Sequence, residues 1–212
     1  MSEIRLTQLD GIDFYYRADT QDWNILNESC GNLYTKFFEV EKDEIWYDIG
    51  ANIGGFSCYA AKKEAKAVLA FEPVTENLQM LINNVVLNHF EQTILIYPKG
   101  ITDNGRNIPL FIDRENYGNC STFRDGLIEH VNVETIPVES LNSYTGKCIK
   151  IDTEGYEFEI LSKLDLTKVN KIVVEDHYWL YGREKSDQIS NMLKDAFPKT
   201  AYHEDYMLYA WR

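Results

Sequence analysis

Paired cysteines and long apolar runs are both missing from this sequence. Its four cysteines are scattered and form no C-x-x-C pair, and Cys58 and Cys148 lie in apolar stretches, where a thiol behaves as a small buried hydrophobe. The N-terminus lacks the apolar region of a secretory signal, so we expect a reducing, cytoplasmic compartment. No apolar run approaches the roughly 20 residues that a membrane-spanning helix requires. We therefore expect no membrane partner.

Positive charge is also scarce. Lysine and arginine number 21 against 34 aspartate and glutamate residues, which gives a formal net charge of −13. Such a surface repels polyphosphate at long range, so nonspecific binding of nucleic acid is disfavoured, although a local basic patch stays compatible with this charge. Hydrophobic residues make up 44% of the chain, which predicts a packed globular core. The length of 212 residues fits one domain with small additions.

The first 40 residues have a pattern of their own. Residues 3–17 alternate around the turn dipeptide Asp10-Gly11, which predicts a β-hairpin. Residues 21–38 repeat apolar side chains at three- and four-residue spacing, which predicts an amphipathic helix. We assign residues 1–40 to an N-terminal extension and 41–212 to the main domain.

The main domain alternates between strand and helix patterns. Such alternation predicts an α/β, Rossmann-like fold, with a mostly parallel sheet, helices on both faces and an antiparallel C-terminal strand. The expected strands are 45–49, 67–71, 93–97, 147–151, 171–174 and 206–211, and the expected helices are 56–63, 75–88, 157–164 and 185–196.

An insertion separates the third and fourth of these strands. Residues 99–140 carry turn signals and strand-like stretches at 108–112 and 131–138, so we interpret them as a β-excursion over the sheet edge that acts as a substrate lid. Candidate acceptor contacts within it are Tyr117, Asn119 and Ser121.

Two acidic residues flank a glycine-rich turn at the first two strand ends. The first strand reaches Asp48 and continues into Gly50-Ala51-Asn52-Ile53-Gly54, where glycines let the backbone approach a ligand closely. The second strand ends beside Glu72. Ligands of open α/β sheets bind outside the carboxyl ends of the strands, and a carboxylate at the second strand can accept both hydroxyls of a ribose. The arrangement predicts a site for an adenosine-bearing ligand.

The residues of this turn favour S-adenosylmethionine (SAM) over ligands that carry phosphate. The NAD fingerprint G-x-G-x-x-G is absent, and a P-loop would need Lys-Ser/Thr where Phe56-Ser57 stands. SAM carries a sulfonium and an ammonium but no phosphate. An acidic residue at the start of the turn therefore favours SAM. A glycine-rich turn without any ligand is the alternative, which the acid–glycine–acid combination disfavours.

Three blocks of the chain resemble the FkbM family of SAM-dependent methyltransferases. They are D-I-G-A-N-I-G at 48–54, F-E-P at 71–73 with Asn77 one helical turn later, and K-I-D-T-E-G-Y-E at 150–157. The third block is the most specific, and the resemblance spans residues 45–178. It implies a class I methyltransferase fold and transfer of a methyl group to a hydroxyl of a sugar, glycan or other small-molecule acceptor.

The resemblance also implies positions for the cofactor. The glycine-rich turn would line the methionine side of SAM, Glu72 would hold the ribose, and Gly100 with Ile101 would lie near the adenine. The residues expected to bind the cofactor are Asp48, Gly50, Ala51, Asn52, Gly54, Glu72, Gly100 and Ile101.

The acceptor is expected at the ends of the fourth and fifth strands. Methyl transfer to a hydroxyl needs alignment of the reacting atoms and a group that accepts the proton. We expect the base to be His177 or Asp152, with Glu154 and Glu175 orienting the acceptor and the base.

Several of these residues have structural alternatives. Lys150 and Glu157 together would form an ion pair, Asp152 would cap a helix ahead of Gly155, and His177 would be a hydrogen-bonded structural histidine. We weigh the alternatives beside the catalytic roles.

A metal site is a further hypothesis for the same strand ends. Asp152, Glu175 and Asp176 offer the oxygen ligands that Mg²⁺ prefers, and the ion would lower the pKa of an acceptor hydroxyl. Acidic residues beside a cationic cofactor need no metal to explain them, so we expect none.

Two other functions remain open. An RNA methyltransferase would need a basic stripe, for which Lys62, Lys63 and Lys66 are the candidates. A non-catalytic SAM-binding domain would bind the cofactor without turnover.

Overall fold

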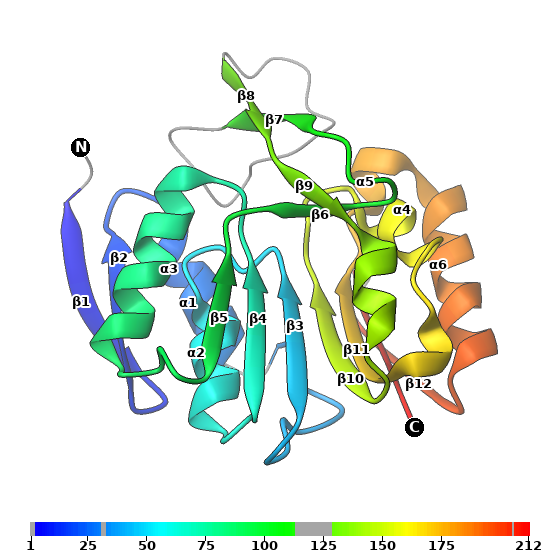
Figure 1. The fold of residues 1–212 in the computed structure, drawn as a ribbon, viewed down its shortest axis with the longest axis horizontal. Coiled ribbons are helices and arrows are strands. Elements are labelled where there is room, and N and C mark those ends of the chain that lie inside the picture. Colours follow the sequence, from blue (N-terminus) through cyan, green and yellow to red (C-terminus); the bar gives the residue numbers. More distant parts are fainter. Residues whose placement is uncertain (1–2, 31–32, 113–128, 205) are drawn as a thin grey trace.

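Seven strands form a central sheet in the computed structural model, which describes residues 3–30, 33–112, 129–204 and 206–212 (Figure 1). The strand order is β12-β13-β11-β10-β3-β4-β5. Their bounds are β3 Ile45–Ile49, β4 Ala67–Phe71, β5 Ile94–Tyr97, β10 Lys147–Ile151, β11 Val169–Glu175, β12 Lys199–His203 and β13 Met207–Trp211.

The C-terminal strand β13 runs against its neighbours. It pairs antiparallel with both β11 and β12, whereas the pairings from β11 through β10, β3 and β4 to β5 are parallel. The predicted mostly parallel sheet with an antiparallel final strand is confirmed.

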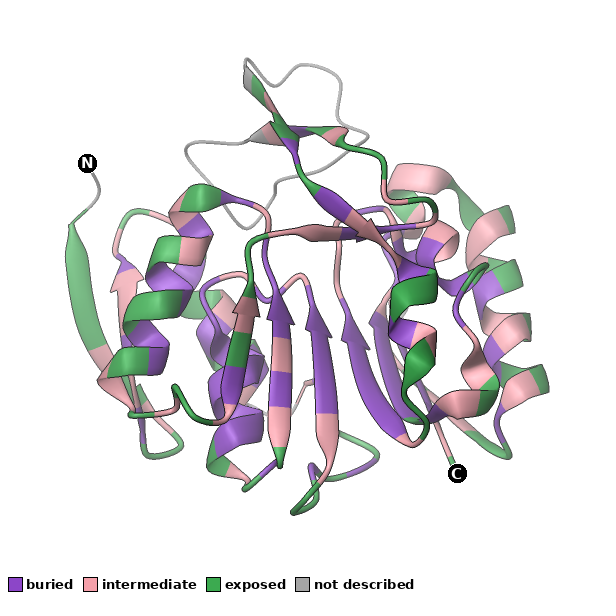
Figure 2. Cartoon of the chain, viewed as in Figure 1, coloured by how far each residue is buried: buried purple, intermediate pink, exposed green. Residues whose placement is uncertain are grey.

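Helices cover both faces of the sheet because successive side chains of a strand point to opposite sides. On β3, Trp46 packs in a core cluster with residues of α1 and α2, whereas Tyr47 and Ile49 pack in a second cluster with residues of α4 and α6. Figure 2 shows the central strands buried between these layers. The helix bounds are α1 Asp22–Cys30, α2 Gly55–Lys62, α3 Thr75–Leu87, α4 Glu157–Leu161, α5 Tyr178–Tyr181 and α6 Arg183–Ala196, with 3₁₀ helices η2 Val138–Ser143 and η3 Leu166–Lys168.

The predicted N-terminal hairpin is confirmed and packs beside α3. Strands β1 (Ile4–Leu9) and β2 (Ile12–Arg17) pair antiparallel. The backbone N–H of Tyr15 donates to Oδ1 of Asn84 on α3 at 2.7 Å. Arg17 at the end of β2 forms a buried ion pair with Asp22 at the start of α1, with Nε and Oδ2 2.8 Å apart. These contacts fix the hairpin and α1 to the sheet domain.

The helix expected over residues 21–38 is shorter than predicted. It ends at Cys30 as α1, and residues 33–37 form turns. Phe37, expected in the apolar stripe, is 39% exposed, whereas Tyr34 is 4% exposed. Burial of Tyr34 against the sheet domain overrides the helical period of this segment.

The insertion forms two small sheets over the carboxyl ends of the central strands (Figure 1). In one, β6 (Gly100–Thr102) pairs parallel with β9 (Thr135–Pro137); in the other, β7 (Ile108–Ile112) pairs antiparallel with β8 (Glu129–Val133). The stretch predicted to be strand-like over 131–138 therefore forms parts of two strands rather than one. It divides at Glu134, whose carbonyl oxygen accepts from Gly100 N–H at 2.8 Å as the chain changes pairing partner. Tyr117, Asn119 and Ser121 lie outside the described residues.

The other predicted helices and strands agree with the structure within three residues at each end, including the helix expected over 157–164, which ends at Leu161. Outside the small sheets of the insertion, β12, α5, η2 and η3 were not predicted. Residues 199–203 are an edge strand of mixed burial, so they lack the apolar alternation that marks a strand in a sequence. Cys58 and Cys148 are fully buried, as expected. Within the described ranges, no helix combines the length and apolar character needed to cross a membrane.

Candidate active site

A cavity of about 290 Å³ opens at the carboxyl ends of β3, β4, β10 and β11. Its volume is at the lower end of the range for small-molecule sites. Strand ends supply its floor, α1 and Tyr34 supply one side, and the excursion supplies another. The lining residues from the strand ends are Ile49, Gly50, Asn52, Phe71, Glu72, Pro73, Val74, Asp152, Thr153, Glu154 and Glu175.

The turn after β3 depends on glycine at position 50. Gly50 has φ +81°, and a Cβ there would lie 1.7 Å from the backbone oxygen of Asp152. No side chain fits such a gap, so the two turns that follow β3 and β10 can approach this closely only with glycine. Both Gly50 and Ala51 donate backbone N–H groups to the carbonyl of Phe71.

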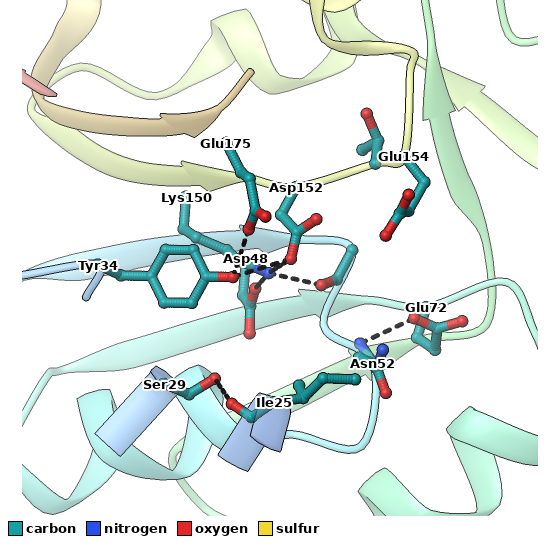
Figure 3. Close-up of polar contacts among 12 residues, drawn as sticks. Ile25, Ser29, Tyr34, Asp48, Asn52, Glu72, Lys150, Asp152, Glu154 and Glu175 are labelled. Carbon is teal, nitrogen blue, oxygen red and sulfur yellow. Dashed lines mark hydrogen bonds and ion pairs between the residues drawn. The ribbon is translucent and has the colours of Figure 1, made fainter. Parts of the chain in front are cut away.

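Glu72 is held by backbone N–H groups at the end of β4. Its Oε2 accepts from Asn52 N–H and its Oε1 from Val74 N–H, both at 2.8 Å. Burial raises the pKa of Glu72 to about 7, against the lowering effect of these hydrogen bonds. Glu72 lies beside Asn52 in the cavity lining (Figure 3). Each of its oxygens keeps a second lone pair, so Glu72 can still accept hydrogen bonds from the hydroxyls of a ligand.

Lys150 links two acidic residues beneath the cavity. Its Nζ lies 3.2 Å from Oδ1 of Asp48 and 3.2 Å from Oδ2 of Asp152, and it donates to the Gly50 carbonyl at 2.6 Å. Burial alone would lower the pKa of Lys150, but the charges of both aspartates outweigh it and raise the pKa. Lys150 therefore stays charged and orders the floor of the site.

Asp152 and Glu175 meet at the hydroxyl of Tyr34. The Tyr34 Oη lies 3.0 Å from Oδ2 of Asp152 and 2.9 Å from Oε2 of Glu175 (Figure 3). Burial favours the neutral form of Asp152, but Lys150 and His177 outweigh it and lower its pKa. Burial and then the charge of Asp152 raise the pKa of Glu175 to about 7. Near neutral pH Asp152 is therefore ionised, whereas Glu175 is only partly ionised.

His177 lies behind the carboxylates and outside the cavity lining. Its ring is 2% exposed; Nδ1 lies 3.0 Å from Oε1 of Glu157, and Nε2 lies 3.6 Å from Oε2 of Glu154. Burial alone would lower the pKa of His177, but Glu157, Glu154 and Asp152 raise it well above its usual value. Burial raises the pKa of Glu154 to about 8. A charged His177 donates hydrogen bonds to its neighbours. Because it is already protonated, it cannot act as the base.

The predicted site residues divide into two groups. Those that line the cavity are Gly50, Asn52, Glu72, Gly100, Ile101, Asp152, Glu154 and Glu175. Those that lie behind the lining are Asp48, Ala51, Gly54 and His177. Asp48 accepts from Ser57 Oγ at 2.6 Å beneath the floor, and Gly54 precedes α2, where a Cβ would meet Leu81.

Two structural alternatives from the sequence are wrong. Lys150 pairs with the two aspartates rather than with Glu157, and Glu157 instead accepts from Thr153 and Gly155 N–H groups and contacts His177. The residue that caps α4 is Tyr156, not Asp152. The hydrogen-bonded placement expected of a structural His177 is what the structure shows.

The magnesium hypothesis fails at one of its three ligands. Asp176 turns away from the cavity and accepts from Tyr181 and Ser186 hydroxyls. Among the described residues, Asp152, Glu154 and His177 each bring one ligand atom to within 4.8 Å of the others. The raised pKa of His177 keeps this ring protonated, which opposes its use as a metal ligand.

Acceptor specificity was expected to depend on residues 1–40, but sequence reasoning named none of the N-terminal residues that line the cavity. Gln21, Asn24, Ile25, Glu28 and Tyr34 line the cavity. Their helical spacing predicted only an amphipathic surface, and no motif marks Tyr34. The polar face of α1 was the available signal, since Asn24 and Glu28 lie on it four residues apart and Gln21 comes just before the helix.

A mostly parallel α/β sheet with an acid-lined cavity at its strand ends is the arrangement expected of a class I SAM-dependent methyltransferase. The family model for the methyltransferase FkbM domain matches residues 48–207. The chain therefore belongs to the FkbM methyltransferase family, as the three sequence blocks predicted, and its cofactor is SAM.

Curated relatives share modest identity with the chain. The hexuronic acid methyltransferase AglP of Haloferax volcanii is 26% identical over 176 residues, which cover 80% of this chain and 72% of that protein. The AMB antimetabolite synthetase AmbE of Pseudomonas aeruginosa is 24% identical over 213 residues, covering 78% of this chain but 10% of that protein.

Solved structures support the fold. Trm5 of Methanocaldococcus jannaschii, solved with adenosine, superposes with a TM-score of 0.51 at 13% identity, over 99% of this chain and 54% of that chain. A candidate transferase of Pyrococcus horikoshii gives a TM-score of 0.55 at 14% identity, over 99% and 70% of the two chains. The class I methyltransferase fold is confirmed.

Proposed function

We propose that this methyltransferase acts on a hydroxyl oxygen of an uncharged sugar or other small polyol. The observation that carries the proposal is the set of carboxyl groups at the ends of β10 and β11, Asp152, Glu154 and Glu175, which face the cavity. Carboxyl groups exchange hydrogen bonds with hydroxyls, and ionised Asp152 repels an anionic acceptor. The similarity to a hexuronic acid methyltransferase supports a sugar as the acceptor class. It does not support a neutral acceptor, which is inferred from the charge of Asp152 alone.

The cofactor is proposed to lie across the end of β3. Glu72 on one side of β3 accepts the ribose hydroxyls, and the backbone of Gly50 and Asn52 borders the methionine part. Gly100 and Ile101 of β6 border the adenine. Asp48 acts from below the floor by holding Lys150. When bound, SAM supplies an electrophilic methyl group on a positively charged sulfur.

The acceptor is proposed to enter on the β10 side of β3. Asp152 is the base that we favour, since it lines the cavity and its lowered pKa keeps it ionised. A weak base suffices because an attacked hydroxyl becomes strongly acidic as its oxygen is methylated. Glu154 and Glu175 orient the acceptor, and His177 acts behind them as a positioning residue that donates to Glu157.

An RNA acceptor has less support. Lys62 lies at the C-terminal end of α2, and Lys63 follows it with Nζ 3.6 Å from Oδ2 of Asp10. Since α2 begins at the cavity edge of the sheet and runs away from it, these lysines lie near the opposite edge. Phosphate contacts there would not bring a ribose to Asp152.

An acceptor panel tests the proposal. Labelled SAM is incubated with pairs of neutral glycosides and their uronic acid counterparts, with tRNA as a third class. We expect kcat/KM for the neutral member to exceed that for the uronic acid by about tenfold or more, equivalent to at least about 1.4 kcal/mol, and the product to be an alkali-stable ether.

Asp152→Asn is the matched variant for this panel. It should lower kcat by about 100-fold or more while the dissociation constant for SAM stays within about twofold. An alkali-labile methyl ester, a preference for tRNA, or SAM binding with no turnover on any acceptor would each reject the proposed function.

A further inference from the structure

A phenol from outside the family-matched region reaches the centre of the site. Tyr34 precedes residue 48, where the match begins, yet its ring is 4% exposed and its hydroxyl lies between Asp152 and Glu175 (Figure 3). The carboxyl groups of Asp152 and Glu175 are therefore joined by a residue that lies before the family-matched region.

One hydroxyl has one hydrogen, so it cannot donate to both carboxyl groups. The oxygens of Asp152 and Glu175 lie 3.0 and 2.9 Å from the Tyr34 oxygen, both within hydrogen-bond distance. Burial raises the pKa of Tyr34 well above its usual value, so the phenol stays protonated. Both contacts are hydrogen bonds only if one carboxyl group is protonated and donates to the phenol oxygen.

Of the two carboxyl groups, Glu175 has the higher pKa and takes up a proton first. Burial and the charge of Asp152 raise its pKa to about 7, whereas the pKa of Asp152 is lowered. When Glu175 is protonated, the hydrogen bonds run in one direction, from Glu175 to Tyr34 and from Tyr34 to Asp152. Tyr34 and Lys150 both contact Oδ2 of Asp152, which leaves Oδ1 to receive the acceptor hydroxyl.

The ring of Tyr34 is fixed by packing. It lies edge-on to Phe56 of α2, with centroids 5.8 Å apart, and Lys150 Nζ lies 5.0 Å from its centroid. The preceding carbonyl, of Leu33, accepts a hydrogen bond from Tyr209 of β13. A side chain held by three elements can orient a carboxylate, because little rotamer freedom remains to be lost.

We propose that Tyr34 is a positioning residue for methyl transfer, which holds ionised Asp152 in the orientation that accepts the acceptor proton. The inference rests on the proposed function for its catalytic part. Its structural part, a phenol that bridges one neutral and one ionised carboxyl group, does not depend on any acceptor.

The test compares Tyr34→Phe with Tyr181→Phe. Both variants remove one phenol-to-carboxylate hydrogen bond, but that of Tyr181 goes to Asp176, outside the cavity. Tyr34→Phe should lower kcat by about 10- to 100-fold and leave SAM affinity within about twofold, whereas Tyr181→Phe should keep wild-type kcat.

The pH profile gives a readout that a merely structural role would not move. Loss of the Tyr34 hydrogen bond raises the pKa of Asp152, because it removes a donor to the charged form. The acid limb of kcat/KM should therefore move up by about one pH unit in Tyr34→Phe. The other titratable groups around the pair, whose charges are retained in the variant, are Lys150, Asp48, Glu28, Glu154, Glu157, Glu72, His177 and Glu204.

Glu175 supplies a second pair of variants. Glutamine can donate to the Tyr34 oxygen as a protonated glutamate does, so Glu175→Gln should retain more turnover than Glu175→Ala, by about tenfold. If Tyr34→Phe does not fold, this pair decides the proposal. Equal turnover of the two Glu175 variants would overturn it.

A carboxyl titration by NMR separates failure here from failure of the proposed function. With the SAM-free protein and no acceptor, the pKa of Asp152 should be higher in Tyr34→Phe than in the wild type. An unchanged Asp152 pKa, or wild-type kcat with an unmoved acid limb, would overturn the role of Tyr34. A shifted pKa with no activity on any acceptor would uphold the bridge and reject the proposed function alone.

Discussion

Glu72, the residue proposed to hold the ribose of the cofactor, is a buried acid with a raised pKa. It is 4% exposed and its pKa is raised to about 7, so it is only partly ionised at neutral pH. Ribose hydroxyls donate more strongly to a carboxylate than to a carboxylic acid, and the positive charge of SAM favours the same ionised form. SAM binding should therefore tighten as pH rises through 7.

Glu72→Gln tests this at the residue scale. The variant should weaken SAM binding by about 10-fold or more, as expected for loss of a charged hydrogen bond worth about 1.5–3 kcal/mol, and should remove the tightening between pH 6 and 8. Isothermal titration calorimetry measures both effects. Glu91→Gln, at an exposed acid after α3, is the control, and pH-independent SAM binding by the wild type would contradict the assignment.

At the scale of elements, the turn after β3 and the turn after β10 fit together through Gly50. The Cβ clash of 1.7 Å is with backbone, which no rotamer change relieves. The distance between the two turns fixes where Asp152 lies relative to Asn52 and Glu72. The geometry of the proposed site thus depends on residue 50 having no Cβ.

Gly50→Ala should destabilise the protein more than Gly146→Ala does. Both glycines have φ +81°, but a Cβ on Gly146 would meet its nearest atom, Asn170 Nδ2, at 3.5 Å. The shared backbone strain costs about 1–2 kcal/mol, and the clash should add at least about 2 kcal/mol at Gly50. Denaturant unfolding measures the difference. Equal losses of stability would show that the two turns separate without cost.

For the whole molecule, the buried carboxyl groups set the pH dependence of stability. Burial raises the pKa values of Glu72, Glu154 and Glu175 from 4.5 to about 7, 8 and 7. Between pH 5 and 8 the folded state then holds more protons than the unfolded state, so stability falls as pH rises. His177, with its raised pKa, acts in the same direction, whereas the lowered pKa of Asp152 matters only below about pH 4.

The free energy of unfolding should therefore decrease from pH 5 to pH 8 in the SAM-free protein. Each pKa unit by which burial raises one of these groups adds about 1.4 kcal/mol to the loss of stability between pH 5 and pH 8. Partial exposure of Glu154 and Glu175 to solvent reduces their share of this loss. Chemical unfolding at several pH values measures the slope, which Glu154→Gln should reduce. Saturating SAM should flatten it further, since a cation lowers these pKa values. A rise in stability across this range would contradict the protonation states described here.

The sequence alone determined the fold, and it placed acidic residues and glycines at the strand ends where the structure has its cavity. Strands 45–49, 67–71 and 147–151 were predicted at their observed bounds, because buried parallel strands leave a local apolar signal. The division at residue 40 stays a prediction.

Only the tertiary structure decided which side chains face the cavity. Asp48 and His177 were expected there by their positions at strand ends, yet packing directs them behind the lining, toward Lys150 and Glu157. Tyr34 carries no local signal, since its hydroxyl meets carboxyl groups 118 and 141 residues later. Periodicity reports which face a residue occupies, but contacts between distant segments depend on how the elements pack.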